Sequence, residues 1–583
     1  MTLSDQLAAL VAQVLQAVPL EIAPDAIHFE RPTDTSFGDL ATTVALSSFK
    51  QLSAQEKSIY KNPAGWAHFL AEAISKEIIT TELKADVQEV VVAGPGFINF
   101  KLSDRYLLQE LSGMQSRKSI TQIKKPRIVI VEYSSPNIAK PFTVGHLRST
   151  IIGSAIAAIL EAVGYEVKRD NHLGDWGTQF GKLIVAIKKW GDIDALEKDD
   201  RPVKKLVELY VKFHEEAEIH PELEDEARAW FKNLEDGNSE AKILWQKCID
   251  WSWKEFNVIY EQLDIHFSED FNNGKGLGES FFENKMLPVI VELQEKKMLQ
   301  VGKNGAQLVF FPNDELPPLM ILKQDGATLY ATRDLATDYY RKVTFGPDSL
   351  IVNEVGAEQS LYFKQIYKIE EMLGWFKPSQ RVHVGHGLYR FKDKKMSTRK
   401  GNVIWLEDVL LEAKERAMAF TKDEVLAAQV GLGALKWNDL KRSSHLDVVF
   451  DWDEVLNLKG NSGPYVQYTV VRAVSILKKA QQFVAPMVDE TLSLNAQERE
   501  IVLLLGQFNE VLHKAADEYA PHHLVGYLYE LAQAFNTFYN QHSVLGKDVA
   551  ANTQQLRLIL TEQTAQVLSQ GLTILGIEIP EKM

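Results

Sequence analysis

Ile128-Val129-Ile130-Val131 is the stretch of sequence that decides the fold, because a continuous β-branched run is typical of a strand buried on both faces of a parallel sheet. A loop at residues 134–145 follows it. From Ile152 to Val163 apolar residues repeat at helical spacing, and Gly164 is suited to cap the end of that helix. Strand, loop and helix make the first half of a βαβ unit, which binds nucleotides where a strand's carboxyl end meets a helix N-terminus. We therefore predict a nucleotide site at the loop.

The remaining strands of the predicted sheet come much later in the chain. They are Leu308-Val309-Phe310-Phe311, Leu350-Ile351-Val352 and Arg381-Val382-His383-Val384, with a helix at 361–374 between the last two. Residues at about 190–265 are charged and helical, and their aromatic side chains are expected to form a core rather than a platform for stacking bases. These aromatic residues are Trp230, Phe231, Trp245, Trp251, Trp253 and Phe256. The fold class is therefore α/β, with a split Rossmann-like parallel-sheet catalytic domain that carries a helical insertion.

Further domains are expected on both sides, because 583 residues are too many for one hydrophobic core of roughly 250–300 residues. A small α+β N-terminal domain is predicted at 1–115, opening with an amphipathic helix capped by Ser4. The catalytic domain takes 116–450. Residues 451–583 predict an all-α helix bundle, because their apolar residues repeat at spacings of four and three. The seam consists of Leu524, Leu528, Leu531, Phe535 and Phe538.

The composition sets limits on location and metal content. No apolar run approaches the roughly 20 residues of a membrane span, so no membrane contact is expected. The first residues lack the basic start of a secretory signal, which predicts a cytoplasmic protein. The single cysteine, Cys248, excludes an internal disulfide and a cysteine-rich zinc site. We therefore expect no structural metal bound by the protein itself.

The formal net charge of −15 argues only weakly against a nucleic-acid partner, since a large acidic protein can still present a basic face. Two local clusters are basic. The first, equally consistent with a solvated linker, consists of Arg117, Lys118, Lys124, Lys125 and Arg127. The second consists of Lys392, Lys394, Lys395, Arg399 and Lys400.

Gly145 and His146 stand where the predicted loop opens the helix. Glycine allows a nucleotide to approach closely, and an imidazole can donate to phosphate oxygens as negative charge builds on them. A short pattern ending in Gly-His is weak by itself, and His383-Val384-Gly385-His386 has the same form. No apolar helical stripe follows that second copy. Context therefore favours Thr143-Val144-Gly145-His146 as the phosphate site and leaves 383–386 as a strand end and active-site wall.

The second candidate element is the basic loop Lys395-Met396-Ser397-Thr398-Arg399-Lys400-Gly401-Asn402-Val403. Alone it predicts only a solvated charged turn. Its position changes that interpretation, because it and the Gly-His element lie in order on opposite halves of one split nucleotide-binding fold.

The chain resembles the class I aminoacyl-tRNA synthetases, and within them the arginyl-tRNA synthetase family. Beyond the two elements above, the matching blocks lie in order over essentially the whole chain. They are Glu132-Tyr133-Ser134-Ser135-Pro136-Asn137-Ile138-Ala139-Lys140-Pro141-Phe142, His172-Leu173-Gly174-Asp175-Trp176-Gly177-Thr178-Gln179, Tyr330-Ala331-Thr332-Arg333-Asp334, Gly460-Asn461-Ser462-Gly463-Pro464-Tyr465 and Leu575-Gly576-Ile577-Glu578. The resemblance implies ATP-dependent formation of arginyl-adenylate with release of pyrophosphate. Transfer of arginine to the terminal ribose of tRNA(Arg) follows, giving AMP.

The same resemblance implies the residues of the site. Those expected at ATP, which arrives with Mg²⁺, are Thr143, Gly145, His146, Gly387, Lys395, Met396 and Ser397. Those expected to line the arginine pocket are Glu132, Ser135, Asn137, Tyr330, Asp334 and Gln359. A guanidinium is a planar charged fork of donors, so a pocket for it needs carboxylates and acceptors. Asp334, with Tyr330 one helical turn before it, suits the guanidinium end of the pocket. Asp334 could instead be an ordinary helix-surface acid, and Glu132 an ordinary strand-end acid.

Two positions depart from the general signatures. Thr143 stands where a histidine is usual, and Thr398 stands where a second lysine is usual. The Thr143 hydroxyl can contact a phosphate but cannot reproduce an imidazolium. Our hypothesis is that Lys140, on the loop before Gly145, supplies the missing positive charge. The expected catalytic set is therefore Lys140, Gly145, His146 and Lys395.

The resemblance also assigns the tRNA contacts. It places the anticodon at the C-terminal domain and the outer corner of the tRNA at the N-terminal domain, where unstacked bases are read by aromatic stacking and hydrogen bonds to base edges. The candidates are Tyr465, Tyr468 and Tyr539 at the anticodon and Phe97 and Asn99 at the corner. Core packing is the alternative for each of them. A monomer is expected, and the family commonly needs bound tRNA before it activates arginine.

Two other functions remain open from the residues alone. A small nucleotidyltransferase shares the Gly-His element but does not need long helical domains on both flanks. A catalytically silent, synthetase-like RNA-binding protein would explain Thr143 and Thr398. The presence of His146, Lys395, Asp334 and Gln359 argues against it.

Overall fold

The computed structural model describes residues 2–18, 20–32, 34–116, 120–302, 304–391, 404–480 and 488–583. The chain divides into two compact units. The larger consists of residues 120–471, 509–529 and 568–583, and the smaller of residues 1–119, 472–508 and 530–567. The predicted boundaries near 115 and 450 stay predictions.

A parallel four-stranded sheet lies at the centre of the larger unit, in the order β10-β9-β4-β5. Its strands are β4 (Ile128–Glu132), β5 (Glu166–Asp170), β9 (Leu350–Gly356) and β10 (Arg381–His386). Val129 of β4 pairs with Val167 of β5 and with Leu350 of β9, so β4 is a central strand. Its residues 129–131 are buried, as the sequence predicted. Because the chain leaves β4 toward β5 on one side and returns through β9 on the other, the order reverses at β4, where α/β folds bind ligands.

Two helices connect strands of this sheet. Helix α6 (Val144–Ala162) joins β4 to β5, and helix α15 (Ser360–Leu373) follows β9. Gly374 adopts φ +72° at the end of α15, the left-handed conformation that glycine accepts most readily. The predicted strand, helix and strand at 350–384 are confirmed.

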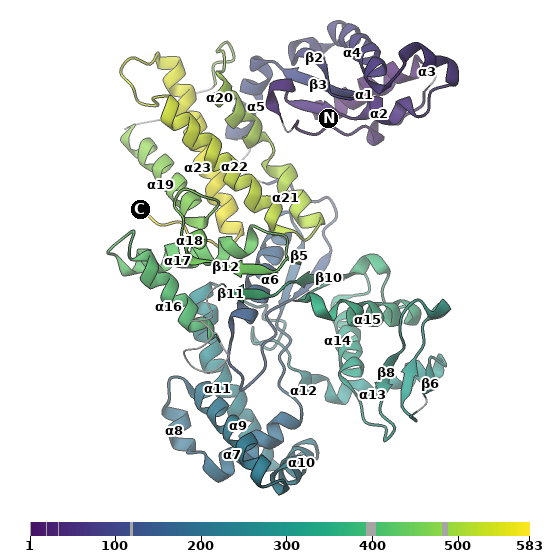
Figure 1. Cartoon of the computed structure of the whole chain (residues 1–583), viewed down its shortest axis with the longest axis vertical. Helices are drawn as coiled ribbons and strands as arrows, with labels where there is room; N and C mark the ends of the chain where they lie inside the picture. The colour runs from purple at the N-terminus through teal and green to yellow at the C-terminus, as the bar shows by residue number, and fades with distance from the viewer. Residues whose placement is uncertain are drawn as a thin grey trace. The chain divides into compact units, whose positions relative to one another are not determined.

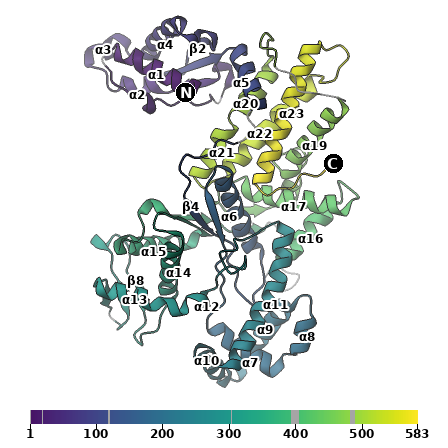
Figure 2. The same cartoon turned by 180° about the vertical axis from the view of Figure 1, so that it is seen from behind.

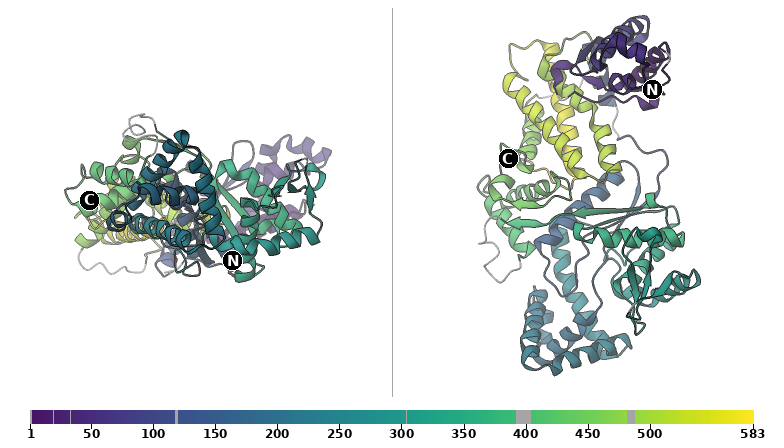
Figure 3. Two further views of the ribbon diagram at one scale, coloured as in Figure 1. Left: turned by 90° about the horizontal axis from the view of Figure 1, so that it is seen from below. Right: turned by 45° about the vertical axis from the view of Figure 1, so that its right-hand side comes forward.

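The predicted helical insertion separates β5 from β9. Its helices are α7 (Thr178–Trp190), α8 (Ile193–Lys198), α9 (Pro202–Ile219), α10 (Glu222–Glu235) and α11 (Ser239–Leu263). They form a compact group, drawn in blue (Figure 1), which is also seen from behind (Figure 2) and in the turned views (Figure 3). Of the aromatic residues predicted to form its core, Trp251, Trp253 and Phe256 are buried, whereas the other three are partly buried. Cys248 on α11 is also buried, and burial raises the pKa of its thiol to about 12.

One strand prediction was wrong in its placement. The segment at 308–311 was expected in the parallel sheet, but β7 (Gln307–Val309) lies in a separate antiparallel sheet between β6 (Leu299–Val301) and β8 (Leu319–Leu322). A short apolar run predicts a buried strand but not its neighbours, which explains the error. This sheet belongs to a second inserted part with helices α12 (Glu279–Phe282), α13 (Met286–Glu295) and α14 (Tyr330–Phe345).

The larger unit continues beyond β10. The short parallel pair β11 (Tyr389–Phe391) and β12 (Val448–Phe450) encloses helices α16 (Leu406–Ala417) and α17 (Glu424–Leu440) in sequence. Helices α18 (Trp452–Val455), α19 (Gly463–Lys479) and α21 (Phe508–Asp517) come next.

The smaller unit contains an antiparallel sheet in the order β1-β3-β2. The strands are β1 (Leu40–Thr42), β2 (Val87–Ala93) and β3 (Phe97–Leu102); the helices are α1 (Leu3–Gln16), α2 (Val44–Phe49), α3 (Ala54–Tyr60), α4 (Pro63–Thr80), α5 (Asp104–Ser116) and α20 (Ala496–Gly506). Helix α1 is capped by Thr2, whose hydroxyl accepts from the N–H of Asp5 at 3.1 Å, and not by Ser4 as predicted. Helices α22 (Pro521–Gln541) and α23 (Ala551–Ile574) complete the helical C-terminal part.

Candidate active site

The loop after β4 holds an unusual backbone conformation. Ser134, Ser135 and Ala139 adopt φ of +71°, +44° and +58°, which costs non-glycine residues free energy unless the surroundings fix it. The surroundings do so here, because their backbone N–H groups donate to Ser149 Oγ at 3.0 Å, Asn171 Oδ1 at 3.1 Å and Ser252 Oγ at 2.9 Å. The loop is therefore a prebuilt part of the site.

Ser135 and Asn137 on this loop were both predicted to contact arginine. Ser135 Oγ is buried and has no hydrogen-bond partner among the residues that the structure describes. Asn137 forms an isolated parallel bridge with Gly174, and a Cβ at Gly174 would lie 2.3 Å from Asn137 Oδ1. The buried Ser135 hydroxyl is thus available to a ligand, whereas Asn137 is held against the 174 backbone.

His146 lies in the first turn of α6, and its neighbour Thr143 fixes its ring. The backbone N–H of Thr143 donates to His146 Nδ1 at 3.0 Å, and the Thr143 Oγ1 is also 3.0 Å from Nδ1. Because Nδ1 accepts, the proton of the neutral ring is on Nε2, which can then donate to a ligand. Burial, with Lys140 and His386 nearby, lowers the pKa of His146 to about 4, so the ring is a neutral donor at neutral pH.

Lys140 is exposed at the end of the same loop. It is close enough to His146 for its charge to lower the pKa of that imidazole. The structure therefore brings Lys140, Thr143 and His146 together at one helix N-terminus, where the helix dipole also favours anions. Gly145 is exposed there, and a Cβ on it would meet only Thr143 Oγ1 at 3.5 Å.

The chain at 404–406, just after the second signature, lies at this helix N-terminus. Val144 N donates to Ile404 O at 3.3 Å, Leu406 N donates to Phe142 O at 3.0 Å, and Thr143 forms an antiparallel bridge with Trp405. The predicted ATP contacts Lys395, Met396 and Ser397 lie outside the described residues.

Glu132, at the carboxyl end of β4, belongs to a buried ionic network. Its Oε2 accepts from Arg341 Nη2 at 2.5 Å and from Asn353 Nδ2 at 3.0 Å. Arg341 also pairs with Asp170 at 2.5 Å and with Asp338 at 2.9 Å. A single buried guanidinium thus binds three carboxylates and holds the end of β4 in place.

Asp334, on the first turns of α14, is the second predicted carboxylate. Burial raises its pKa to about 6, and the Tyr362 hydroxyl donates to its Oδ2. Tyr330 is 58% exposed at the start of α14, with its ring 5.0 Å from that of Tyr362, and Gln359 is exposed just before α15. Burial is the main cause of the raised pKa of Asp334 and the charge of Glu132 adds to it, so the two acids lie near each other.

His172 is a site residue that the sequence interpretation did not assign. Its Nδ1 is buried and makes no hydrogen bond within the described parts of the chain. Burial raises the pKa values of Asp334, Asp170 and Asp175, and His172 partly opposes that effect at all three, so it lies near these acids. The only signal in the sequence was its place in a block that matches the family.

The second Gly-His copy forms the end of β10. His383 Nε2 is 3.2 Å from Val355 O, and its ring stacks on Phe363 at 4.8 Å. His386 instead lies beside the buried Glu354, with its Nδ1 2.7 Å from Oε1. Gly387, predicted to contact ATP, packs against the 446–447 backbone, where a Cβ would lie 2.7 Å from Asp447 N. That close packing accounts for glycine at 387 without a nucleotide.

The predicted tRNA residues differ in exposure. Phe97 is 36% exposed on β3, whereas Asn99 is 2% exposed and its side chain is not presented at the surface. Tyr468 is 38% exposed, and the partly buried Tyr465 packs 5.6 Å from Tyr529. Tyr539 is 38% exposed beneath the Arg472 guanidinium, 5.1 Å from it. Four of the five thus present ring surface, and none is tested as a contact.

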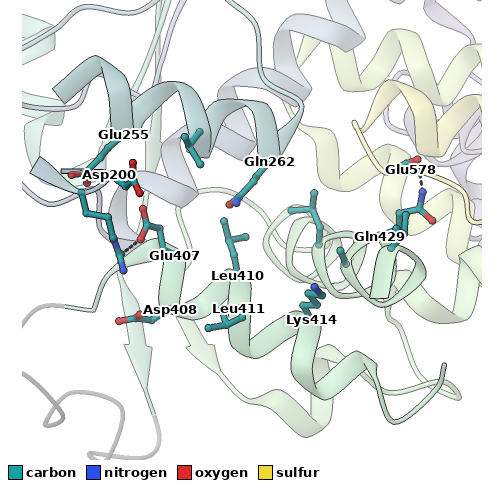
Figure 4. A pocket seen from close by; sticks show the side chains of 15 residues that line it. Asp200, Glu255, Gln262, Glu407, Asp408, Leu410, Leu411, Lys414, Gln429 and Glu578 are labelled. Carbon is teal, nitrogen blue, oxygen red and sulfur yellow. Dashed lines mark hydrogen bonds and ion pairs between the residues drawn. The ribbon is translucent and has the colours of Figure 1, made fainter. Parts of the chain in front are cut away.

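A separate pocket of about 860 Å³ lies between the inserted helices and α16 and α17 (Figure 4). Its lining combines acidic and apolar side chains with Arg201 and Lys414, and none of the predicted site residues lines it. The acids are Asp200, Glu255, Glu407, Asp408 and Glu578. Within the described residues no group of three or more His, Cys, Asp or Glu side chains could hold a metal ion, and no helix is long and apolar enough to span a membrane.

A split parallel sheet with a glycine–histidine element opening the helix after its first strand is the arrangement of the class I aminoacyl-tRNA synthetases. Comparison with known families agrees. The family described as "tRNA synthetases class I (R), catalytic domain" matches residues 109–452, "Arginyl tRNA synthetase N terminal domain" matches 5–102, and "DALR anticodon binding domain" matches 466–583.

Individual relatives give the same result. An arginine–tRNA ligase of Clostridioides difficile is 40% identical over 539 residues, covering 90% of this chain and 92% of that protein. One of Clostridium botulinum type E3 is 40% identical over 597 residues, covering 98% and 99%. The solved arginyl-tRNA synthetase of Plasmodium falciparum superposes with a TM-score of 0.82 at 25% identity, covering 100% and 99%, and that of Thermus thermophilus shares the fold with 0.79 at 24%. The chain belongs to the arginyl-tRNA synthetase family, and the predicted fold class is confirmed.

Proposed function

We propose that this chain is an arginine–tRNA ligase that activates L-arginine with ATP and transfers it to the 3′-terminal ribose of tRNA(Arg). The observation that carries the proposal is the set of residues around the carboxyl end of β4 and the helix after it. Burial, with the charge of Glu132 nearby, raises the pKa of Asp334, which suits these two acids to a guanidinium, and the helix that follows β4 presents His146 Nε2–H to an anion.

The arginine pocket is prepared for a cation. Burial disfavours the ionised form of Asp334, which raises its pKa, and a guanidinium would restore the charge balance. An uncharged isostere would leave a buried carboxylate unpaired, which allows rejection by roughly 10⁴–10⁵ without an editing step.

In the first step an oxygen of the arginine carboxylate attacks the α-phosphorus of ATP, and the bond to the bridging oxygen breaks to release pyrophosphate. Neither this step nor the transfer to tRNA needs a strong base from the enzyme, so positioning and charge stabilisation supply most of the acceleration. His146 donates from Nε2, Lys140 and Lys395 add positive charge, and Gly145 gives the nucleotide room. Mg²⁺ enters as part of the ATP substrate.

The same proposal covers partners and location. The exposed aromatic rings of Tyr468 and Tyr539 would stack on anticodon bases, and Phe97 would stack at the corner of the tRNA. The chain would act as a monomer in the cytoplasm. Sedimentation with and without tRNA measures the first of these, and a dimer would contradict it.

The test is aminoacylation by the purified full chain with total tRNA and radiolabelled arginine or lysine. Arginine should be attached and lysine should not. Incorporation of lysine at a comparable rate, or nucleotidyl transfer without attachment of arginine to tRNA, would reject the proposal. Omitting tRNA from an arginine-dependent pyrophosphate exchange assay then measures whether activation needs tRNA.

A further inference from the structure

No residue in the first turn of α6 carries a positive charge, and Lys140 lies on the exposed loop before it. His146 is neutral, and Thr143, which stands where class I signatures carry an imidazole, instead fixes the His146 ring through its N–H and hydroxyl. A neutral donor stabilises developing negative charge less than an ionised one, since charge-assisted hydrogen bonds are roughly twice as strong. A further cation at the carboxyl edge of the parallel sheet would add positive charge beside the phosphates.

His386 lies at the last position of β10, at the carboxyl edge of the sheet. In the parallel register Val384 pairs with Glu354 and His386 pairs with Gly356. Since side chains alternate along strands, His386 and Glu354 lie on the same face, and their Nδ1 and Oε1 atoms are 2.7 Å apart. The Nδ1 proton is thus committed to Glu354, and Nε2 is directed elsewhere.

Glu354 is suited to keep this imidazole charged. Its side chain is fully buried, and its second oxygen, Oε2, has no hydrogen-bond partner within the described parts of the chain. A buried carboxylate with so little compensation stabilises a cation beside it. The His386 side chain is 15% exposed, so part of the ring is accessible.

Other charged groups near His386 do not cancel the effect of Glu354 on its pKa. Arg148 of α6 and Asp439 of α17 form their own ion pair at 3.2 Å, and their effects on the imidazole are opposite. His146 of α6 is neutral, and His383 on the same strand turns to the Val355 carbonyl. Burial alone would lower the pKa of His386, but Glu354 outweighs it and the pKa is raised. Burial is the main cause of the lowered pKa of His146 and the charge of His386 adds to it, so the two imidazoles lie near each other.

We propose that His386, held by the buried Glu354, is a further catalytic residue that donates a charged hydrogen bond from Nε2 to the phosphates of ATP, in place of the imidazole that Thr143 lacks. This inference rests on the proposed function and names a residue of its phosphate site. His386 keeps its proton throughout: the α-phosphorus gains the arginine carboxylate oxygen, and pyrophosphate leaves with the electrons of the broken bond. Glu354 is a positioning residue.

The first test is arginine-dependent pyrophosphate exchange by the full chain with tRNA present. His386→Gln keeps a neutral donor and should lower kcat/KM for ATP by about 10- to 100-fold at pH 7, with KM for arginine unchanged. His386→Lys restores a charge and should recover activity above the Gln variant at pH 8. Circular dichroism melting establishes that each variant is folded.

The second test separates charge from structure by pH. In the parent protein Glu354 keeps His386 protonated, so activity falls as pH rises through the raised pKa of the pair. Glu354→Gln keeps the shape and removes the counter-ion, so the fall should begin at lower pH. His383→Gln, on the same strand but turned away, is the matched control and should leave the pH midpoint in place.

Three results would overturn the inference: a His386→Gln variant within twofold of the parent, a Lys variant no better than Gln at pH 8, or the same pH midpoint with and without Glu354. The proposed function is tested by a different result, because it requires the parent chain to attach arginine to tRNA. A parent that charges tRNA while these variants behave like it would reject the role of His386 alone.

Discussion

The Asp334 carboxylate should favour arginine binding but lower the stability of the free protein. Replacing it in Asp334→Asn removes the carboxylate charge but keeps an oxygen that can accept from the Tyr362 hydroxyl. Without that charge the guanidinium of arginine loses a partner in the pocket. Truncating one partner of a buried, hydrogen-bonded charge pair costs about 2–5 kcal/mol, so KM for arginine should rise roughly 30- to 5,000-fold.

The stability effect follows from the raised pKa of Asp334. A carboxyl whose pKa is about 6 when folded, against an ordinary value of 3.8, binds its proton more tightly in the folded state. Its stabilising contribution is present below pH 3.8 and is lost as pH rises through 6, so the ionised group destabilises the free protein at pH 7.5. With 1.36 kcal/mol for each pKa unit, Asp334→Asn should stabilise the free protein by about 1–3 kcal/mol.

Two assays measure these effects. Aminoacylation at varied arginine gives KM and kcat, with KM for ATP as the internal control. Thermal melting without ligands, at pH 7.5 and at pH 4.5, gives the stability difference, which should shrink at the lower pH. An unchanged KM for arginine would refute the placement of arginine at Asp334, and a variant that melts below the parent at pH 7.5 would refute the charge argument.

Three other changes have defined outcomes. His146→Ala should lower adenylate formation by about 10²–10³, or ~2.7–4 kcal/mol, and near-normal pyrophosphate exchange would contradict its role as donor. Lys140→Ala should weaken ATP binding and adenylate formation by several-fold, and parent-like values for both would remove it from the phosphate site. Arg341→Met leaves the buried carboxylates of Glu132 and Asp170 without their cationic partner and should cost about 3–5 kcal/mol in denaturant unfolding, whereas Arg228→Met, in an exposed pair, should cost under about 1 kcal/mol; equal costs would contradict the importance of the network.

The sequence predicted the parts of the fold that depend on local pattern. The β-branched run at 128–131 and the stripe that begins at Ile152 gave the central strand and its helix, because burial on one or both faces leaves a period in the chain. The sequence did not predict contacts between residues that lie far apart in the chain. Arg341 and Glu132 are 209 positions apart, and no spacing rule connects them.

The site was predicted with similar limits. His146 and Asp334 followed from motif and chemistry, and the structure places them near the starts of helices α6 and α14. The exposure of a strand residue depends on what covers the sheet, which is why Asn99 appeared accessible in sequence but is buried. Thr143 was interpreted as a phosphate contact, and only the geometry of the helix cap shows it holding the His146 ring.

The burial of Cys248 has a practical consequence for studying the reaction cycle. The thiolate is the reactive form, and a pKa of about 12 together with full burial keeps this thiol unreactive toward maleimides at neutral pH. Cysteines introduced at exposed positions, one in each compact unit, would therefore accept a fluorophore pair without removal of the native residue. Energy transfer between the dyes would then report how the two units move when tRNA, arginine and ATP are added one at a time.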